Sequence, residues 1–491
     1  MYLGIDIGTS TSKGVLVRPD GKAIVRAEKP HGVSTPRPGW VEHDAETIWW
    51  ADFVALTREL VRCADGEPIE ALAVSGIGPC LLPADVDGRP LRPAILYGVD
   101  TRAGVEIAEL EAELGPLTVL ERCGSPLTSQ AVGPKLRWLI RHEPQVWKAT
   151  RMLLMASSFL VHRLTGRYVL DHQSASQCVP MYDLMARDWA IDWAESVAPG
   201  LRLPELAWPT EVVGRITPEA AAATGLPVGL PVTTGTIDAW AEAAGVGVRE
   251  PGDIMLMYGT TMFLTQILTL PRPHPGLWTT CGTWPGTYTS AAGMATSGAV
   301  TDWLRVLTGG EFGELLEEAA GVPPGSRGLL VLPYFAGERT PLFDPDARGI
   351  IAGLTLSHQR PEIYRAILEG IGYGVRHNLE VMSDAGAHAK RLVAVGGGTK
   401  GGLWTRIVSD ITGLPQQLPT DTIGASLGNA YLAAESQGRD TSSWNPVIAT
   451  VEPDPARTRH YDSFYRHYRT LYENTRATAH FLAREQHRAA P

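Results

Sequence analysis

A turn near the N-terminus brings together the residue types that bind polyphosphate. Its chemistry-bearing residues are Asp6, Gly8, Thr9, Ser10, Thr11 and Lys13. Glycine lets a phosphate approach the backbone, hydroxyls and amides donate hydrogen bonds, and an acid can organise Mg²⁺ through water. We therefore predict a phosphate-binding turn with Asp6 beside the metal, against the alternative of an ordinary polar hairpin.

A second Gly-Thr turn lies in the other half of the chain. Gly259, Thr260 and Thr261 follow the apolar run DIMLMY and precede MFLTQIL. Alone, this pattern would indicate a plain turn. Because it repeats the first arrangement without the acid, we predict a second phosphate-binding turn.

Asp238 lies between the run LPVTTGTI and the segment AWAEAAGVGV, where a strand passes into a helix. Aspartate is common at helix N-caps, and a cap is the plainest role for it. Ligands also collect at strand ends in α/β sheets, and helix-terminal amides lower a carboxyl pKa. We predict an ionised Asp238 that serves as catalytic base for an acceptor hydroxyl and, with Asp6, lies near the metal.

Two further loops follow predicted strands. Gly397 and Gly398 belong to the run GGGTKGG, which suits a nucleotide close to the backbone, with packing glycines as the alternative. Asp100 and Arg102 follow ILYGV and indicate either a hydroxyl-binding pair or a helix cap beside a surface arginine. The 13 histidines are scattered, and we assign them to packing and surface roles.

Alternating apolar residues and turn signals predict strands around these loops. The opening segment predicts three successive strands, and 253–268 predicts a second hairpin. Strands are also expected at 71–74 and 93–97, followed by a helix over 101–114. Because strands and helices alternate, the sequence favours an α/β architecture.

Helical periodicity is strongest in the second half. A helix over 361–382 should bury one stripe, comprising Ile363, Ala366, Ile367, Gly370, Ile371, Gly374 and Val375. A strand, a glycine loop and another helix follow, with an inner face of Trp404, Ile407, Val408 and Ile411. An amphipathic helical tail is expected from about Ser463. The cluster GVGVREPGD marks a boundary between domains 1–246 and 247–491.

Composition excludes several classes of protein. The net charge is −10 and no basic run occurs, which disfavours nucleic-acid and anionic-membrane partners. The five cysteines are far apart and form no CxxC pair, so neither a disulfide framework nor a zinc site is expected. The N-terminus does not resemble a signal peptide and no apolar run is long enough to span a bilayer, so we expect a cytoplasmic protein.

Nine blocks in order resemble the FGGY carbohydrate kinase family. They are LGIDIGTSTSKGVLV, PGWVEHDAETIWW, ALAVSGIGPC, RPAILYGVDTRA, FLVHRLTGRYVLDHQSAS, TTGTIDAWAEAAGVGV, LMYGTTMFL, LPYFAGERTPLFDPDARG and VAVGGGTKGGLWTRIVSDITG. The resemblance implies a two-lobed ribonuclease H-like (actin-like ATPase) α/β fold with a central cleft. It also implies sugar and catalytic base on the first lobe and ATP on the second.

The resemblance also assigns roles to residues. It implies that the two turns bind the ATP phosphates and that Asp238 is the base. It adds Leu403 and Gly424 to the adenine site with Gly397 and Gly398, and it makes Asp100 and Arg102 sugar contacts. The expected cofactors are ATP and Mg²⁺.

The acceptor depends on a departure from the xylulokinase pattern. Those enzymes carry Met-His-Gly where this chain has Ile77, Gly78, Pro79 and Cys80, so Pro79 replaces the histidine. The pattern still lies nearest to xylulokinases and gluconokinases, and predicts a ketopentose such as xylulose. Gluconate, a tetritol or pentitol, a quorum-signal sugar, or an ATP-gated chaperone-like role without transfer remain alternatives. Gly78 and Pro79 are expected at the acceptor, and a homodimer is compatible with the chain.

Overall fold

The computed structural model describes residues 1–489, which divide into two compact units. The first unit comprises 1–249, 267–289 and 423–445, and the second comprises the intervening segments 250–266, 290–422 and 446–489. The first cut falls three residues after the sequence-based boundary at 246. Two later segments, 267–289 and 423–445, also belong to the first unit, so the two units are discontinuous in sequence and one boundary does not separate them.

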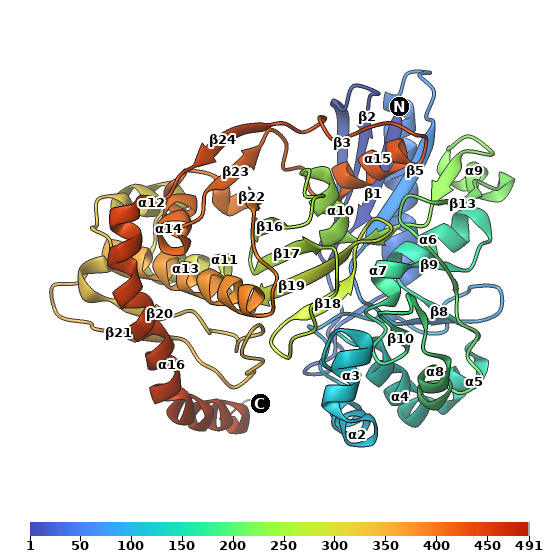
Figure 1. Ribbon diagram of the computed structural model, residues 1–491. Helices are drawn as coiled ribbons and strands as arrows, with labels where there is room; N and C mark the ends of the chain where they lie inside the picture. The colour runs from blue at the N-terminus through green and yellow to red at the C-terminus, as the bar shows by residue number, and fades with distance from the viewer. Residues whose placement is uncertain (490–491) are drawn as a thin grey trace. The chain divides into compact units, whose positions relative to one another are not determined.

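The first unit is built on a sheet of order β13-β14-β5-β1-β2-β3, with β15 also paired to β5 (Figure 1). Its strands are β1 (Tyr2–Ile7), β2 (Thr11–Val17), β3 (Ala23–Pro30), β5 (Ala71–Gly76), β13 (Val212–Arg215), β14 (Pro231–Thr233) and β15 (Thr236–Ile237). Strands β14 and β15 run parallel to β5, as does β1, whereas β2 is antiparallel to both of its neighbours, β1 and β3. The three successive strands predicted at the N-terminus are confirmed.

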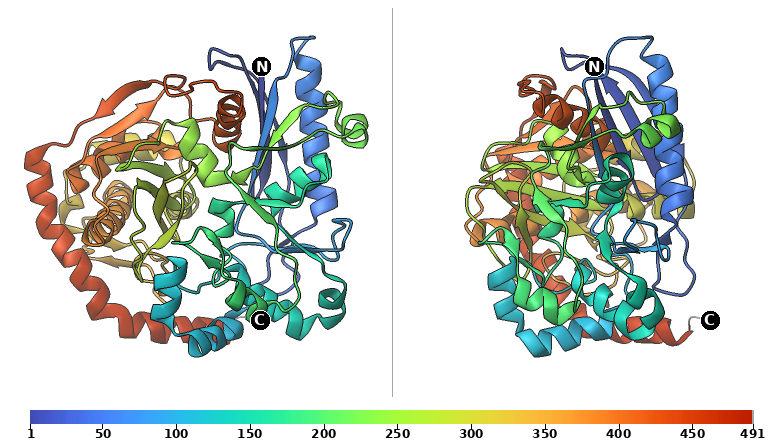
Figure 2. Two further views of the ribbon diagram at one scale, coloured as in Figure 1. Left: turned by 45° about the vertical axis from the view of Figure 1, so that its right-hand side comes forward. Right: turned by 90° about the vertical axis from the view of Figure 1, so that its right-hand side faces the viewer.

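Helices lie on both faces of this sheet, and others lie beyond it. The helices of the unit are η1 (Ala45–Trp50), α1 (Ala51–Cys63), α2 (Gly104–Leu114), α3 (Pro116–Cys123), α4 (Val132–His142), α5 (Pro144–Ala149), α6 (Ala156–Thr165), α7 (His172–Ala175), α8 (Ile191–Val197), α9 (Pro218–Thr224), α10 (Asp238–Gly245) and α15 (Ala425–Glu435). Helix α1 runs along one face (Figure 2), and α15 packs on the other.

Side-chain alternation along β1 decides which residues face the chemistry. Leu3 and Ile5 belong to the core under α1, whereas Tyr2 belongs to the core under α15. Asp6, the last residue but one of β1, therefore lies on the α15 face. Gly4 lies on that face too, and a Cβ there would collide with the carbonyl of Ser426, so glycine is what lets α15 approach the sheet closely.

Short strands in the first unit complete its loops. They are β4 (Glu42–His43), β6 (Leu82–Ala84), β7 (Ala94–Ile95), β8 (Met152–Leu154), β9 (Val169–Asp171), β10 (Tyr182–Asp183), β11 (Asp188–Trp189), β12 (Glu205–Ala207) and β18 (Trp278–Cys281). The strand predicted over 93–97 is present but reduced to β7. The helix predicted from 101 begins at Gly104, because the side chain of Asp100 accepts backbone and arginine hydrogen bonds in the preceding turn.

The second unit contains the sheet order β19-β17-β16-β22-β23-β24. Its strands are β16 (Asp253–Tyr258), β17 (Met262–Leu268), β19 (Tyr288–Met294), β22 (Arg391–Val395), β23 (Gln416–Pro419) and β24 (Val447–Val451), with a separate pair β20 (Leu330–Leu332) and β21 (Ile350–Ala352). The predicted second hairpin is confirmed, since β16 pairs with β17 in antiparallel register around residues 259–261.

The helices of the second unit are α11 (Gly298–Thr308), α12 (Phe312–Ala320), η2 (Ser326–Gly328), α13 (Arg360–Asp384), η3 (Gly397–Thr399), α14 (Leu403–Thr412) and α16 (Pro455–Ala489). The predicted helix with close-packed glycines is α13, where a Cβ on Gly370 would lie 2.5 Å from the carbonyl oxygen of Val331. The inward residues predicted for α14 are all buried.

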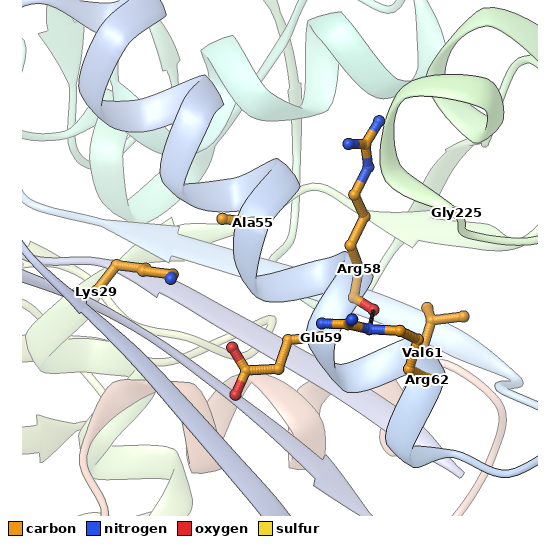
Figure 3. Close-up of a pocket in the computed structure, with 7 residues that line it drawn as sticks. All are labelled: Lys29, Ala55, Arg58, Glu59, Val61, Arg62 and Gly225. Atoms are coloured by element: carbon orange, nitrogen blue, oxygen red, sulfur yellow. Dashed lines mark hydrogen bonds between the residues drawn. The ribbon is translucent and has the colours of Figure 1, made fainter.

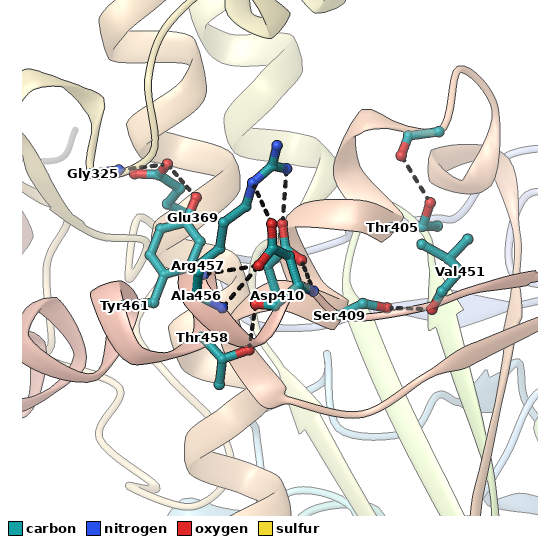
Figure 4. A network of polar contacts seen from close by, with 12 residues as sticks. Gly325, Glu369, Thr405, Ser409, Asp410, Val451, Ala456, Arg457, Thr458 and Tyr461 are labelled. Atoms are coloured by element: carbon teal, nitrogen blue, oxygen red, sulfur yellow. Dashed lines mark hydrogen bonds and ion pairs between the residues drawn. The ribbon is translucent and has the colours of Figure 1, made fainter.

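The C-terminal helix α16 begins at Pro455, eight residues before the predicted start near Ser463. Asp410 explains this, because its carboxylate accepts from the amide of Asp454 at 2.8 Å and from Arg457 at 3.2 Å. Further along, the hydroxyl of Tyr461 donates to the buried Glu369 at 2.8 Å. Figure 4 shows this network, which fixes α16 within the second unit. No helix within residues 1–489 is long and apolar enough to cross a membrane.

Candidate functional site

Three strand ends of the first unit bring two carboxylates together. Ser75 on β5 is paired in register with Asp6 on β1 and with Thr236 on β15. Asp238 follows β15 directly, so Asp6 and Asp238 come from the strands on either side of Ser75. Residues at the carboxyl ends of parallel strands share one edge of the sheet, which is where α/β proteins bind ligands.

Asp6 is held by a buried relay of hydrogen bonds. The hydroxyl of Ser75 donates to Oδ1 of Asp6 at 2.6 Å. The side-chain amide of Asn429, on α15, donates to Ser75 Oγ at 2.7 Å and to the carbonyl of Ile5 at 2.8 Å. Because the amide can only donate through Nδ2, it directs the Ser75 proton toward Asp6. Neither Ser75 nor Asn429 stood out in the sequence, since their roles depend on a contact between residues 354 positions apart.

The electrostatics at Asp238 contradict the sequence-based expectation of a lowered pKa. Burial and the neighbouring charge of Asp6 raise the pKa of Asp238, and the hydrogen bond from the amide of Ala239 at 2.7 Å only partly opposes them. Burial also raises the pKa of Asp6. Ile237 is the N-cap and Asp238 is the first helical residue, so the capping role was also wrong.

Glu242, one turn along α10, adds a third acid that the sequence reading missed. Burial, followed by the charge of Asp6, raises the pKa of Glu242 to about 7, and Lys13 opposes this rise. A Cβ built on Gly424 would lie 3.9 Å from Oε2 of Glu242, so this predicted adenine-site glycine lies beside it. Spacing i, i+4 from Asp238 could have drawn attention to Glu242.

The first turn is completed by residues 8–10. Thr9 Oγ1 lies 3.2 Å from the hydroxyl of Tyr97. Among residues 1–489, the backbone amides of Thr9 and Ser10 donate no hydrogen bond to protein, whereas the carbonyls of Gly8 and Ser10 both accept one from His31. A turn with unpartnered amides is suited to binding an anion.

The second turn has the same form but different supports. The carbonyl of Gly259 accepts from the amide of Gly298 at 3.0 Å. The carbonyl of Thr260 accepts from the amides of Ser297 and Ala299 at 3.0 and 3.1 Å. The supports are therefore backbone amides at the beginning of α11. Thr261 closes the turn by accepting from the amide of Gly259 at 3.1 Å.

The glycines predicted near a nucleotide differ in their surroundings. A Cβ on Gly398 would lie 2.7 Å from the ring of Trp404, so packing requires glycine there, whereas nothing lies within 4 Å of a Cβ on Gly397. Leu403 begins α14. These residues belong to the second unit and Gly424 belongs to the first.

Asp100 and Arg102 are buried, which contradicts the surface-arginine alternative. The side chain of Arg102 is fully buried, pairs with Asp100 at 2.7 Å and with Glu42 at 2.8 Å, and lies 4.1 Å over the ring of Trp40. The amide of Val41 donates to the other side of Asp100 Oδ2 at 2.7 Å. This network rigidifies the loop, and a role in sugar contact stays a prediction.

The predicted acceptor residues lie beside the strand that leads into Asp238. A Cβ on Gly78 would lie 2.7 Å from Ile237, and Pro79 is buried. Burial raises the pKa of the Cys80 thiol to about 12, with the charge of Lys135 opposing and that of Asp238 reinforcing the rise. Gly78, Pro79 and Cys80 are therefore close to the predicted base. Lys135 is a buried cation that the sequence reading missed.

An open groove of about 510 Å³ lies elsewhere in the first unit, between α1, β3 and the end of α9. Figure 3 shows Lys29, Glu59 and Arg62 pointing into it, while Arg58 extends toward Gly225. None of the predicted site residues lines this groove. Its mixed charges and openness give it no evident part in the chemistry at Asp238.

Comparison with known proteins identifies the family of the chain. Models of the N- and C-terminal domains of the FGGY family of carbohydrate kinases match residues 1–245 and 254–436. The chain is 31% identical to the xylulose kinase of Escherichia coli K12, covering 96% of this chain and 99% of the relative. It is 30% identical to a glycerol kinase of Nocardia farcinica, covering 88% and 89%. The crystal structure of xylulose kinase from Rhodospirillum rubrum matches with a TM-score of 0.90 at 34% identity, covering 98% and 99%.

Proposed function

The chain belongs to the FGGY family of carbohydrate kinases, and from this premise we propose that it transfers the terminal phosphoryl group of ATP to a hydroxyl of a ketopentose such as xylulose. Its fold is the mixed α/β, actin-like ATPase type with two sheet-containing domains. The observation that carries the proposal is the placement of Asp238 beside Asp6 at the carboxyl edge of the first sheet, next to a turn with unpartnered amides.

Asp238 acts as the base in this proposal. The amide of Ala239 occupies Oδ1, and Oδ2 accepts no hydrogen bond from residues 1–489. Oδ2 is thus available to accept a hydrogen bond from the acceptor hydroxyl and to receive its proton as the phosphoryl group is transferred. The raised pKa makes the ionised carboxylate a stronger base than an ordinary aspartate.

The two turns bind phosphate groups of ATP. Thr9 and Ser10 offer amides in the first turn, and Thr260 and Thr261 offer hydroxyls in the second. Gly8, Thr11 and Lys13 complete the first turn, while Gly397, Gly398, Leu403 and Gly424 serve the nucleotide. These donors position charge that develops on the transferred group, which is the main source of catalysis in phosphoryl transfer.

The carboxylates fit a magnesium ion. The ionised carboxylates of Asp6 and Asp238 repel one another, and a divalent cation between the two charges would reduce this repulsion. Magnesium also prefers oxygen ligands, which both residues supply. Residues 1–489 contain no group of three or more His, Cys, Asp or Glu side chains arranged to hold a metal. Asp6 and Asp238 would accordingly hold the ion through water, and when bound it would neutralise charge on the phosphates.

Gly78, Pro79, Asp100 and Arg102 determine the acceptor in this proposal. Pro79 and Gly78 adjoin the strand before Asp238, and the buried Asp100–Arg102 pair holds its loop in one conformation. The similarity to a glycerol kinase supports a polyol as the second candidate acceptor. Changing Pro79→His should therefore alter the acceptor profile more than the affinity for ATP.

A panel of acceptors tests the proposal. ADP release from MgATP would be measured with D-xylulose, L-xylulose, D-ribulose, gluconate, glycerol, erythritol and pentitols. We expect strong stimulation by D-xylulose. If only glycerol or a pentitol stimulates ADP release, the acceptor is a polyol and not a ketopentose. If the protein binds ATP but no acceptor of the panel stimulates ADP release, the result favours an ATP-gated protein without sugar transfer.

A further inference from the structure

One histidine holds the first phosphate turn through both its ring and its backbone. Nε2 of His31 lies 3.1 Å from the carbonyl oxygen of Gly8, and the backbone amide of His31 donates to the carbonyl of Ser10 at 2.9 Å. On the other side of the ring, Nδ1 lies 2.8 Å from Oδ2 of Asp52. The side chains of His31 and Asp52 are only 8% and 16% exposed, so water competes weakly for these contacts.

These contacts determine where the turn directs its amides. In a trans peptide the carbonyl and the amide of one unit point in opposite directions. Fixing the carbonyl of Gly8 toward His31 therefore points the amide of Thr9 away from the ring. That amide has no protein acceptor within residues 1–489, and neither has the amide of Ser10, whose peptide unit contains the carbonyl of Thr9. The backbone of Thr9 also acts on the His31 ring and helps to raise its pKa, so the histidine holds the carbonyls and leaves the amides available for an anion.

The proton inventory fixes the ionisation state of the ring. A backbone carbonyl only accepts, so Nε2 must carry a proton toward Gly8, and an ionised Asp52 only accepts, so Nδ1 must carry one as well. Both contacts together require the imidazolium form. Burial lowers the pKa of His31, but hydrogen bonds to Asp52 and Gly8 outweigh it and raise the pKa overall.

The other groups around the ring are compatible with this state. Ser12, on β2, donates its hydroxyl to the same Oδ2 of Asp52 at 2.8 Å. His43, on β4, lies with its ring 5.2 Å from His31, edge to face. Burial and then the charge of His31 lower the pKa of His43 to about 4, so it stays neutral, and it accepts from the indole of Trp49. Asp52 is thus the charged group that faces His31.

We propose that His31, held as an imidazolium by Asp52, is a positioning residue that directs the amides of Thr9 and Ser10 toward the phosphates of ATP. This inference rests on the proposed function for the identity of the anion. It revises the assignment of every histidine to packing and surface roles. The separation of 21 positions between His31 and Asp52 hid the pair in the sequence.

Nucleotide binding measured by calorimetry with MgATP, in the absence of acceptor, tests the role directly. His31→Leu removes both ring donors at similar size and should raise Kd about tenfold, the value of one or two hydrogen bonds. His31→Gln restores a donor for Gly8 and should recover part of the loss. His162→Gln is the matched control, because that ring also lies near two carbonyls, 3.2 and 3.3 Å away, but at surface loops.

The pH dependence separates positioning from a merely structural role. The hydrogen bonds from the His31 imidazolium to Gly8 and Asp52 are present below pH 6.5, the ordinary pKa of histidine, and one of them is lost as pH rises through the raised pKa of His31. The wild-type Kd for MgATP should therefore rise as the pH passes this raised pKa. His162→Gln should follow the same curve, which also includes the ionisation of ATP itself. His31→Gln should lack the additional rise, and Asp52→Asn should move it to lower pH.

The ring protonation can be read without any nucleotide or turnover. In ¹⁵N-histidine-labelled protein, the signal lost in His31→Gln should titrate with a midpoint above 6.5, the ordinary value for histidine. His377, whose pKa burial lowers to about 3, should supply a neutral reference. A titration midpoint below 6.5 for His31, or equal Kd for His31→Leu and wild type with unchanged Tm, would overturn the inference. ATP binding without any phosphorylated acceptor would instead count only against the proposed reaction.

Discussion

The first and second Gly-Thr turns share a sequence pattern but are supported by different chemistry. The first turn lies among ionisable groups, with Asp6 and Asp238 at the neighbouring strand ends and His31 on its carbonyls. The second is supported by backbone amides at the beginning of α11, such as that of Gly298. Backbone amides do not titrate. We therefore expect changes of charge or pH to affect ATP binding and turnover through the first turn, and changes of side-chain size to affect ATP binding through the second.

The largest effect should come from removing the base in the first unit. Asp238→Asn keeps the size of the side chain but cannot receive the proton, and kcat should fall about 10²–10⁴-fold. Binding of MgATP, measured by calorimetry on the same preparation, should weaken far less than kcat falls, because Asp6 and both phosphate turns remain. Near-normal turnover in this variant would remove Asp238 from the mechanism.

A matched pair of glycines tests the second turn. A Cβ on Gly298 would lie 2.7 Å from the carbonyl oxygen of Gly259, so Gly298→Ala must displace the turn, and KM for ATP should rise about tenfold. Gly313→Ala, in a helix with nothing within 4 Å of the added carbon, is the control. The shape of the pH profile should stay unchanged in both variants. A shift of the profile in Gly298→Ala would break the contrast between the turns.

The crowded carboxylates of the first unit should reduce stability at high pH. Because their folded pKa values are raised, the folded state binds more protons than the unfolded state, and stability falls as pH rises from about 3.8 through the raised values. In metal-free buffer, Asp238→Asn should therefore be more stable than wild type at pH 8, by on the order of a few kcal/mol. The difference should shrink toward pH 4. Chemical denaturation at both pH values would measure it, and equal stabilities at pH 8 would argue against the electrostatic account.

The smallest expected effects distinguish packing glycines from nucleotide glycines in the second unit. Gly398→Ala would place its Cβ 2.7 Å from Trp404 and should cost about 1–3 kcal/mol of stability. Gly397→Ala has open space and should leave stability nearly unchanged, so any rise in its KM for ATP would report a nucleotide contact. Denaturation midpoints and ATP kinetics on the two variants supply the comparison. Equal destabilisation by both would contradict the packing difference.

The local patterns were predictable because they depend on neighbours in the chain. Alternating apolar residues interrupted by Gly-Thr predicted both hairpins. An aspartate between a predicted strand and a predicted helix indicated Asp238 as a site residue. The periodic stripe of α13 was equally local. In each case the hydrophobic period and the turn residues suffice, because they specify the element without information from distant segments.

What could not be predicted depends on contacts between distant segments. The raised pKa of Asp238 comes from burial and from Asp6, which lies more than two hundred residues away in the chain. The burial of Arg102 requires Trp40 and Glu42 from another loop. The relay from Asn429 to Ser75 joins segments that are 354 positions apart in the chain. No periodicity or spacing encodes such contacts, so the fold had to supply them.

The most direct test of the account is the stoichiometry of turnover with D-xylulose. The protein would be incubated with MgATP and D-xylulose, and both ADP and sugar phosphate would be quantified by ³¹P NMR. The account predicts one sugar phosphate for each ADP formed, with little ADP when the sugar is left out. Accumulation of ADP together with inorganic phosphate and without sugar phosphate, for xylulose and for every polyol tried, would contradict a sugar kinase.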